Sequence, residues 1–182
     1  MNKANEQLEL TIQKQNILIK ELQQQLKFKE SSLKESNHFL NSIINSTTDG
    51  IWDWPDVDKE EEYWSPQWKK LLGYEEDEIE ANASLFFSMI HPEDTERTTQ
   101  ALNNHMDKKT PFDIEYRLKI KTGEYKWFHA KATIYKDEMT GKKRMAGVII
   151  DIDRRKKAEQ ALEESIAFLE LTMNNNPDLI FV

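Results

Sequence analysis

The sequence predicts an α+β domain placed between two long helices. All five glycines, all five tryptophans and four of the five prolines lie between residues 46 and 153, which marks one folded domain. The flanking segments 1–45 and 154–173 contain no Gly and no Pro, and they carry apolar residues at helical spacing. Inside the domain, short elements precede three longer strands, an order typical of the α+β class.

Residues 1–45 predict a coiled coil. A heptad repeat fits without a break, and eight of its twelve a and d positions are apolar. Isoleucine at the early a positions favours a parallel two-stranded coil, so we expect a parallel homodimer. Polar residues at three d positions, Gln15, Lys29 and Ser36, weaken the seam and would let the helices rotate or slip. The alternative is a lone amphipathic helix that packs on its own domain. The residues expected at the dimer interface are Ile12, Ile19, Leu22, Leu26, Leu33 and Leu40.

The first half of the domain, from residue 46, predicts short elements. Two aromatic strands are expected at 51–54 and 62–64. Gly73 closes the first helix, and His91-Pro92 opens the last, since a proline suits the first turn of a helix. The helical segments are expected at 66–72, 75–79, 84–90 and 91–108.

The second half predicts an antiparallel meander with turns at Thr122-Gly123 and Thr140-Gly141. Its first strand alternates apolar and charged residues, so we expect one face of the strand to be buried and the other to be exposed to solvent. The last strand is apolar on both faces, so we expect a terminal helix to cover the second face. The three strands are expected at 112–121, 125–136 and 143–152.

After the meander, residues 154–173 predict a second and shorter coiled-coil helix. Residues 34–52 align without gaps on residues 163–181, with seven of nineteen positions identical. The entry from helix to first strand therefore recurs. We expect residues 174–182 to begin a second, truncated copy of the domain, with an effector further along the chain.

Charge is unevenly distributed along the chain. The net charge of −8 argues against a nucleic-acid-binding role. Residues 49–80 carry 12 acidic and 3 basic side chains, whereas residues 117–157 carry 13 basic and 5 acidic ones. The two sets either form separate solvated faces or meet, within a protomer or across a dimer. The carboxylates crowded at 56–62 are expected to be solvated, on a hairpin turn.

Composition excludes several kinds of site. The absence of Cys rules out disulfides, thiolate metal sites and cysteine nucleophiles, and it fits a reducing, cytoplasmic compartment. No apolar run is long enough to span a membrane, and no secretory signal is present. No two of the four His are three or four residues apart, so no metal site is expected. Without a catalytic triad or a glycine-rich phosphate loop, we expect no catalysis by this segment.

Several motifs, in the right order and at the right spacing, resemble a PAS sensory (sensory-box) domain. The resemblance covers residues 46–159. It implies a PAS fold, a five-stranded antiparallel sheet with short helices on one face. It also implies a sensor or dimerisation module of a bacterial histidine kinase, diguanylate cyclase or chemoreceptor. The motifs are DGIWDW (49–54), YWSPQWKKLLGYEEDEI (63–79), IHPED (90–94), YRLKIKTGEYKWF (116–128) and the PAC-like AGVIIDIDRRKKAE (146–159).

The closing motif of the family usually reads Asp-Ile-Thr, and here it reads Asp151-Ile152-Asp153. The resemblance implies that these residues pass a signal from the sheet to the following helix, and on to a downstream PAS or effector domain. Two other hypotheses stay open. The chain is either a ligand-free dimerisation and spacing module, or a docking module whose outer sheet face binds another protein. Trp127 is expected on that face, as a contact in the dimer or for the partner.

The resemblance does not identify a cofactor, and the residues favour a domain that binds no cofactor. The light-sensing flavin branch needs a Cys, and it uses polar amides where this chain has Leu118, Phe128 and Ile149. Other flavin arrangements stay open through Trp52 and Trp54. Haem-binding relatives use a His on the long helix, where His105 is expected to be exposed near the helix end. Strand alternation predicts either a small apolar ligand pocket or a filled core, formed by Tyr116, Leu118, Phe128, Ala130, Ile149 and Phe86.

Overall fold

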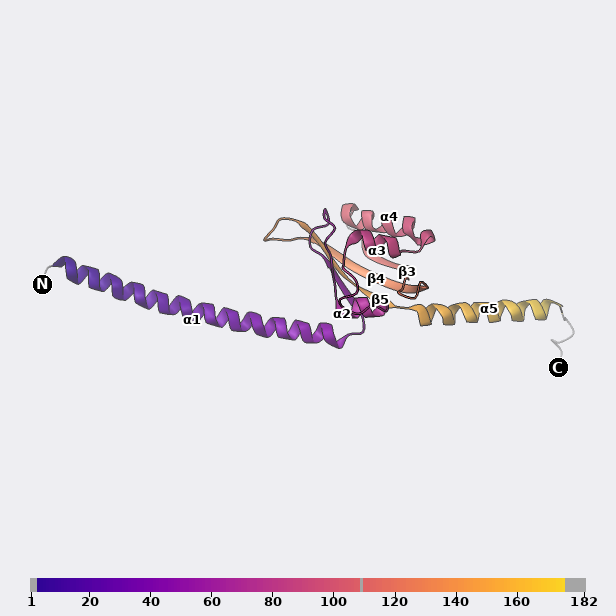
Figure 1. Cartoon of the computed structure of the whole chain (residues 1–182), viewed down its shortest axis with the longest axis horizontal. Coiled ribbons are helices and arrows are strands. Elements are labelled where there is room, and N and C mark those ends of the chain that lie inside the picture. Colours follow the sequence, from indigo (N-terminus) through magenta and orange to yellow (C-terminus); the bar gives the residue numbers. More distant parts are fainter. Residues whose placement is uncertain (1–2, 109, 176–182) are drawn as a thin grey trace. The chain divides into compact units, whose positions relative to one another are not determined.

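The computed structural model describes residues 3–108 and 110–175. Within these ranges the chain divides into two units between Thr47 and Thr48. The first unit is a single helix, α1 (Lys3–Ser46). The second is an α+β domain followed by the helix α5 (Asp153–Asn175) (Figure 1).

Helix α1 runs for 44 residues without interruption. The predicted seam residues Ile12, Ile19, Leu22, Leu26, Leu33 and Leu40 are between 46% and 62% exposed. Apolar side chains at this spacing need a covering surface, because an isolated helix gains little stability from propensity alone. The helix is confirmed, and the parallel dimer stays a prediction.

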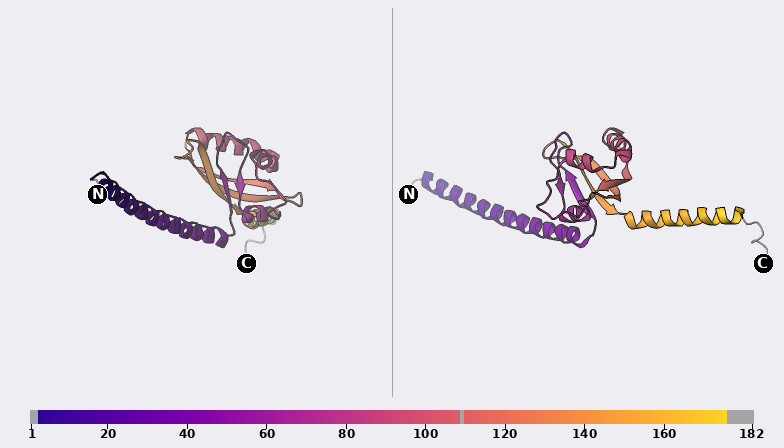
Figure 2. Two further views of the ribbon diagram at one scale, coloured as in Figure 1. Left: turned by 60° about the vertical axis from the view of Figure 1, so that its left-hand side comes forward. Right: turned by 45° about the vertical axis from the view of Figure 1, so that its right-hand side comes forward.

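Helix α5 begins directly after the last strand of the domain (Figure 2). Its apolar residues are also exposed, with Ile166 the least and Phe168 the most. The second helix expected from the sequence is therefore present. The predicted second domain copy falls largely on residues 176–182, which lie outside the described residues.

A five-stranded antiparallel sheet forms the centre of the domain, in the order β2-β1-β5-β4-β3. β5 joins the N-terminal strands to the C-terminal meander, because it pairs with β1 on one side and β4 on the other. The predicted fold class is confirmed. The strands are β1 (Gly50–Trp54), β2 (Tyr63–Trp64), β3 (Phe112–Lys119), β4 (Tyr125–Lys136) and β5 (Lys143–Asp151).

Three helices cover one face of this sheet: α2 (Pro66–Leu71), α3 (Ala83–Met89) and α4 (Pro92–Lys108) (Figure 2). Asn82 caps α3, since its side-chain oxygen accepts from the N–H of Leu85 at 2.8 Å. Gly73 adopts φ +84°, which lets the chain leave α2. The helical turn expected at 75–79 is wrong, because the segment forms a non-helical turn that Glu78 closes by accepting from the N–H of Glu75.

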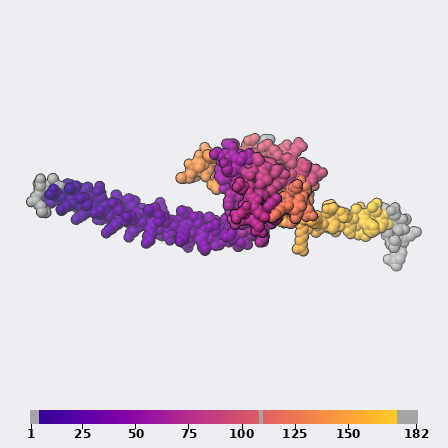
Figure 3. Space-filling model, viewed as in Figure 1, coloured from indigo at the N-terminus to yellow at the C-terminus, as the bar shows by residue number. Residues whose placement is uncertain are grey.

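The hydrophobic core lies between these helices and the inner face of the sheet. Gly50 in β1 marks a close approach between the sheet and α2, because an added Cβ would lie 2.7 Å from the Cα of Trp68. Only glycine fits there without displacing the helix. The outer part of the β4–β5 hairpin, by contrast, projects from the domain (Figure 3), and Met139 at its tip is 95% exposed.

The acidic and basic segments of the sequence meet within the chain. The carboxylate of Asp53 accepts two hydrogen bonds from the guanidinium of Arg144, at 2.7 and 2.6 Å. Two lysines of the basic segment form further ion pairs with the acidic segment, Lys142 with Asp56 and Lys121 with Glu78. Of the alternatives left open by the sequence, contact within a protomer is the one that these pairs show.

Asp94 ties the start of α4 to the edge strand β3. Its buried carboxylate accepts from the backbone N–H and from Nε of Arg117, both at 2.9 Å. The N–H of His91 donates to the carbonyl of Arg117 at 2.9 Å, so both backbone groups at this edge position are paired. Burial acts to raise the pKa of Asp94, but the hydrogen bonds from Arg117 outweigh it and hold the pKa at about 2.

We expect Asp94→Asn to lower the free energy of unfolding at pH 7 by about 2–4 kcal/mol, because it removes the buried carboxylate that Arg117 faces and leaves the exposed carboxylate of Glu93. The pKa of Asp94 is lower in the folded chain, so its contribution is complete above about pH 4 and is lost as the pH falls toward 2. Urea unfolding at pH 7 and pH 3 measures both effects. Asp107→Asn, at an exposed carboxylate of α4, is the control, and equal losses in both variants would contradict the prediction.

Candidate functional site

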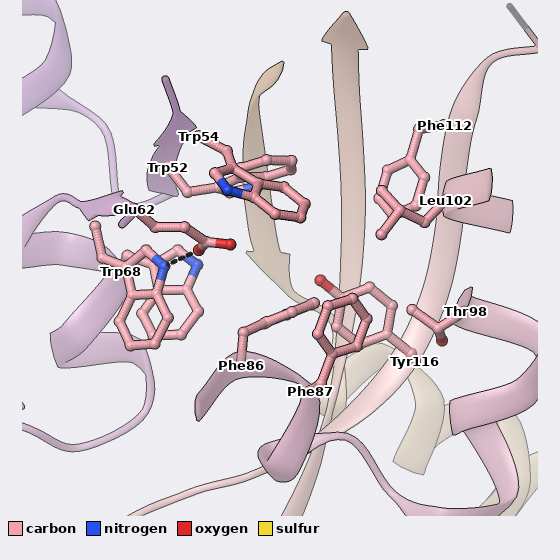
Figure 4. Close-up of a pocket in the computed structure, with 11 residues that line it drawn as sticks. Trp52, Trp54, Glu62, Trp68, Phe86, Phe87, Thr98, Leu102, Phe112 and Tyr116 are labelled. Carbon is pink, nitrogen blue, oxygen red and sulfur yellow. Dashed lines mark hydrogen bonds between the residues drawn. The ribbon is translucent and has the colours of Figure 1, made fainter. Parts of the chain in front are cut away.

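A cavity lined by aromatic side chains lies between the N-terminal strands, β3 and the three short helices (Figure 4). Its volume is about 30 Å³, which is room for about two water molecules. The wall consists of Trp52, Trp54, Glu62, Trp64, Trp68, Phe86, Phe87, Thr98, Leu102, Phe112 and Tyr116.

Four tryptophans form one side of this cavity. Trp52 and Trp54 alternate with Asp53 along β1, so both indoles lie on the inner face. Trp64 in β2 is the register partner of Trp52. Trp64 also stacks on Trp68 of α2, with ring centroids 3.9 Å apart. Three elements of the fold therefore contribute to a single aromatic wall.

Phenyl and phenol rings form the opposite side. Phe86 of α3 lies edge-on to Phe87 and to Tyr116 of β3, with centroids 5.4 and 6.0 Å apart. Edge-on contacts suit aromatic pairs because the positive ring edge meets the negative ring face. Thr98 and Leu102 lie four residues apart on α4 and contribute the rest of this side.

Glu62 supplies the carboxylate of the cavity wall. Its Oε2 accepts from Nε1 of Trp64 at 2.6 Å. Within the described ranges, no Lys, Arg or His forms an ion pair with it. Burial raises the pKa of Glu62 to about 7 against the lowering effect of the Trp64 hydrogen bond, and the negative charge of Glu60 adds to the rise.

Other polar atoms in the wall lack protein partners. Nε1 of Trp68 and Oγ1 of Thr98 are buried without a hydrogen bond from the described residues, and each residue is only 1% exposed. Burial raises the pKa of the Tyr116 phenol, and the charge of Glu62 adds to this. Figure 4 shows the Tyr116 hydroxyl and the Glu62 carboxylate directed toward the middle of the cavity. Buried polar groups without partners cost about 1–3 kcal/mol each, so this cavity favours a polar occupant.

Two of the six residues predicted for a pocket, Tyr116 and Phe86, line this cavity. The other four are completely buried on the inner face of the sheet, but they are not part of the cavity wall. Alternation along a strand gives the face of a residue but not which helix covers it. The residues that belong to the filled core are Leu118, Phe128, Ala130 and Ile149.

Sequence reasoning missed Glu62 as a member of the wall. The expectation that the carboxylates at 56–62 are solvated is wrong for this residue, because its side chain turns into the aromatic wall. Strand alternation was the available signal. Glu62 precedes Trp64 by two residues, so the two side chains share a face once 62–64 is read as a strand.

The expectation that His105 is exposed is also wrong. The residue is 6% exposed, and its Nδ1 lies 2.5 Å from the carbonyl oxygen of Thr110. It packs near Phe112 and does not line the cavity. Among the described residues, no three His, Asp or Glu side chains gather closely enough to hold a metal ion. None of the described helices is both long and apolar enough to cross a membrane.

The Asp151-Ile152-Asp153 segment connects β5 directly to α5. The N–H of Ile152 donates to the carbonyl of Trp127 in β4 at 3.0 Å. Asp153 accepts from the N–H of Trp127 at 3.5 Å, and its other oxygen pairs with Lys157 at 2.7 Å. Asp151 accepts from the N–H of Asp153 at 2.9 Å. The carboxylate at position 153 therefore holds the start of α5 against β4.

Trp127 lies half-buried on the outer side of the sheet. Its ring faces the guanidinium of Arg117 at 5.0 Å and the ammonium group of Lys156 at 5.2 Å. Lys156 and Arg155 both pair with Glu115 of β3, at 2.6 and 2.5 Å. The first turn of α5 is thus tied to β3 and β4. A contact of Trp127 with a partner chain stays a prediction.

Comparison with known proteins identifies the family. The family model described as PAS fold matches residues 61–149. The crystal structure of a sensory box histidine kinase/response regulator from Burkholderia thailandensis is 30% identical, with a TM-score of 0.62. That match covers 72% of this chain and 97% of the other. This chain belongs to the PAS family. The PAS domain is a sensory, non-catalytic fold.

Other similar proteins match a smaller share of this chain. Sensor protein FixL of Bradyrhizobium diazoefficiens is 29% identical over 119 residues, which are 65% of this chain. The N-terminal domain of a diguanylate cyclase with PAS/PAC sensor from Marinobacter aquaeolei is 19% identical with a TM-score of 0.51, and it shows the shared fold. The chain spans 23% of the length of FixL and 14% of the length of protein y4lL of Sinorhizobium fredii.

Glu62→Gln is expected to stabilise the protein at pH 8 and to have little effect at pH 5. The pKa of Glu62 rises from 4.5 to about 7 on folding, so the folded chain binds this proton more tightly. The contribution of Glu62 to the free energy of unfolding therefore decreases by about 1–3 kcal/mol as the pH rises from 4.5 to 7. Urea unfolding at both pH values measures the gain, with Glu61→Gln, at an exposed neighbour, as the control. A gain that is the same at both pH values would contradict the assignment.

Proposed function

We propose that this chain is the ligand-responsive sensor module of a multidomain signalling protein of the histidine kinase, diguanylate cyclase or chemoreceptor type. The aromatic cavity receives a small ligand, and α5 carries the response to a domain further along the chain. The similarity to the sensory box histidine kinase supports the class of protein.

The connection between the cavity and α5 through β4 carries this proposal. Tyr116 of the cavity wall is the register partner of Phe128, which also lies opposite Asp151 in β5. The backbone of the preceding residue, Trp127, accepts from the N–H of Ile152 and donates to the carboxylate of Asp153. A displacement of Tyr116 therefore reaches the start of α5 through a single pair of strands.

The contacts that hold α5 are individually weak, which suits a switch. A partly exposed ion pair such as Arg155–Glu115 contributes about 0–1 kcal/mol, and the hydrogen bond from the Trp127 N–H to the buried Asp153 is long, at 3.5 Å. A ligand shifts a conformational equilibrium only by the difference in its affinity for the two states. A small difference at the cavity is enough to change how firmly α5 is held.

We infer that the ligand is neither flavin nor haem. A cavity of about 30 Å³ is far below the roughly 300–1,000 Å³ of sites for larger ligands, which supports a small molecule. The apolar side chains of Leu118, Phe128 and Ile149, where the light-sensing branch has polar amides, support the same inference.

A ligand-free spacer is the second candidate, and the small volume of the cavity favours it. Native mass spectrometry of the gently purified chain, with an absorption spectrum of the same sample, separates the two. The sensor function is supported by excess mass over the bare chains. A bare and colourless sample, whose α5 does not respond to any small-molecule addition, supports the spacer.

We expect Asp153→Ala to increase amide hydrogen exchange in the first turn of α5 by about tenfold or more, since the variant loses the acceptor for Trp127 and the partner of Lys157. Exchange in α4 should not change. Asp153→Thr, which restores the usual residue of the family motif, is the matched control and should keep exchange close to that of the parent chain. Unchanged exchange in Asp153→Ala would remove Asp153 from the proposed route.

We also propose that α1 joins two copies of the chain in a parallel coiled coil. Leu26→Asp places a charge at a predicted a position, and we expect the dimer to weaken by about a hundredfold or more. Ser31→Asp introduces the same group at an f position and should leave the dimer intact. Analytical ultracentrifugation over a range of concentrations measures both. A dimeric Leu26→Asp chain would show that another surface holds the copies together.

A further inference from the structure

The Glu62 carboxylate lies in an aromatic wall without a countercharge. Within the described ranges, its hydrogen-bond donor is the neutral indole of Trp64, and no basic side chain pairs with it. The cavity wall contains no Lys, Arg or His. A buried carboxylate of this kind stays protonated at low pH, or else it is matched by a cation that comes from solution.

The rings around Glu62 suit a cation. Indole faces attract cations more strongly than other aromatic rings, because their electron density is concentrated above and below the ring. Trp52, Trp54, Trp64 and Trp68 all line this space. A carboxylate set in an aromatic wall is the arrangement that recognises alkylammonium groups, because it combines ionic attraction with apolar contact for the methyl groups.

A more open hollow of about 300 Å³ adjoins the cavity and shares Trp54 and Phe87 with it. Its charged residues are Asp58, Glu60 and Lys59, so carboxylates outnumber the single cation. Five of its eight lining residues belong to the strongly acidic segment 49–80. A negative potential at an entrance raises the local concentration of cations and repels anions.

We propose that this cavity binds a short-chain alkylammonium ion of about two to four non-hydrogen atoms, with its ammonium group donating to Glu62 and its methyl groups against the tryptophans. The cavity of about 30 Å³ takes about two of these atoms, and the adjoining hollow of about 300 Å³, which shares Trp54 and Phe87, takes the rest. Thr98 Oγ1, buried and unpaired, is a second acceptor in the same wall. The inference rests on the proposed sensory function and specifies the ligand class of that site.

Trimethylammonium is the probe, and acetamide is its neutral control with the same number of non-hydrogen atoms. Four of the five tryptophans line the cavity, so tryptophan fluorescence of the full 182-residue chain reports occupancy. At pH 8 and constant ionic strength, we expect saturable binding of trimethylammonium and at least about tenfold weaker binding of acetamide. Acetamide also tests the rival ligand class, because its carbonyl can accept from the unpaired Trp68 N–H.

The pH dependence provides a second measurement. Trimethylammonium stays protonated at pH 6 and pH 8, whereas Glu62, with a pKa of about 7, changes charge between them. The other titratable groups that act on Glu62 are Glu60 in the preceding loop and Tyr116 in β3. Tyr116 stays neutral over this range, since its pKa is raised. We expect binding to be about tenfold weaker at pH 6 than at pH 8.

Glu62→Gln should weaken trimethylammonium binding at pH 8 by at least about tenfold and remove the difference between the two pH values. Glu61→Gln makes the same change in net charge at the exposed neighbour and should bind within about twofold of the parent chain. If Glu62→Gln binds the cation as well as the parent chain, or if acetamide binds as tightly, the inference is overturned.

Two further outcomes separate this inference from the sensory function. If acetamide binds and changes amide exchange in α5 while trimethylammonium does not, the cavity is a sensor site for neutral ligands and only the cation inference fails. If neither compound binds more tightly than about 10 mM, the cation inference fails. A bare chain by native mass spectrometry would then also count against the sensory function.

Discussion

The buried hydroxyl of Ser65 connects the two elements on which the cavity depends. Its oxygen accepts from the N–H of Ile51 in β1 at 3.0 Å and from the N–H of Trp68 in α2 at 3.2 Å. The N–H of Ser65 donates in turn to the carbonyl of Ile51 at 2.8 Å. This bridge fixes α2 over Gly50, and it places Trp68 where Trp64 can stack on it. Without this junction the aromatic wall has no defined geometry.

The aromatic wall stabilises the domain, but it also contains polar groups whose burial opposes folding. Stacked and edge-on rings bury a large apolar area, which stabilises the domain. The same wall holds a half-buried carboxylate and leaves Trp68 Nε1 and Thr98 Oγ1 without protein partners. Groups that oppose folding persist where a function requires them, so this combination marks the cavity as the part of the domain to which a ligand adds most.

The first turns of α4 and α5 differ in how firmly they are attached to the sheet. At the start of α4, the buried Asp94 and Arg117 join helix and sheet through several charge-assisted hydrogen bonds. At the start of α5, Arg155 and Lys157 are more exposed, and the buried Asp153 accepts from the N–H of Trp127 at the longer distance of 3.5 Å, so these contacts are weaker. In the function we propose, this difference would let a local change at the cavity alter α5 while the rest of the domain keeps its fold.

The sequence by itself determined the α+β class, the order of the elements and the two flanking helices. These features depend on local signals: glycine-free heptads, the turns at Gly123 and Gly141, and alternation along 112–120. It also assigned Tyr116, Phe128 and Ile149 to the inner face, because side chains alternate along every strand. Register between distant strands carries no such local signal, and neither does the position of a helix over the sheet.

Only the tertiary structure decided which inner residues line a cavity and which fill the core. It brought Trp52, Trp64 and Trp68 together from separate elements, and it turned Glu62 inward from a stretch of carboxylates that was expected to be solvated. It also buried His105, which contacts the carbonyl of Thr110 and packs near Phe112. Such outcomes depend on contacts between residues far apart in sequence, and their energies are set by packing and desolvation rather than by local propensity.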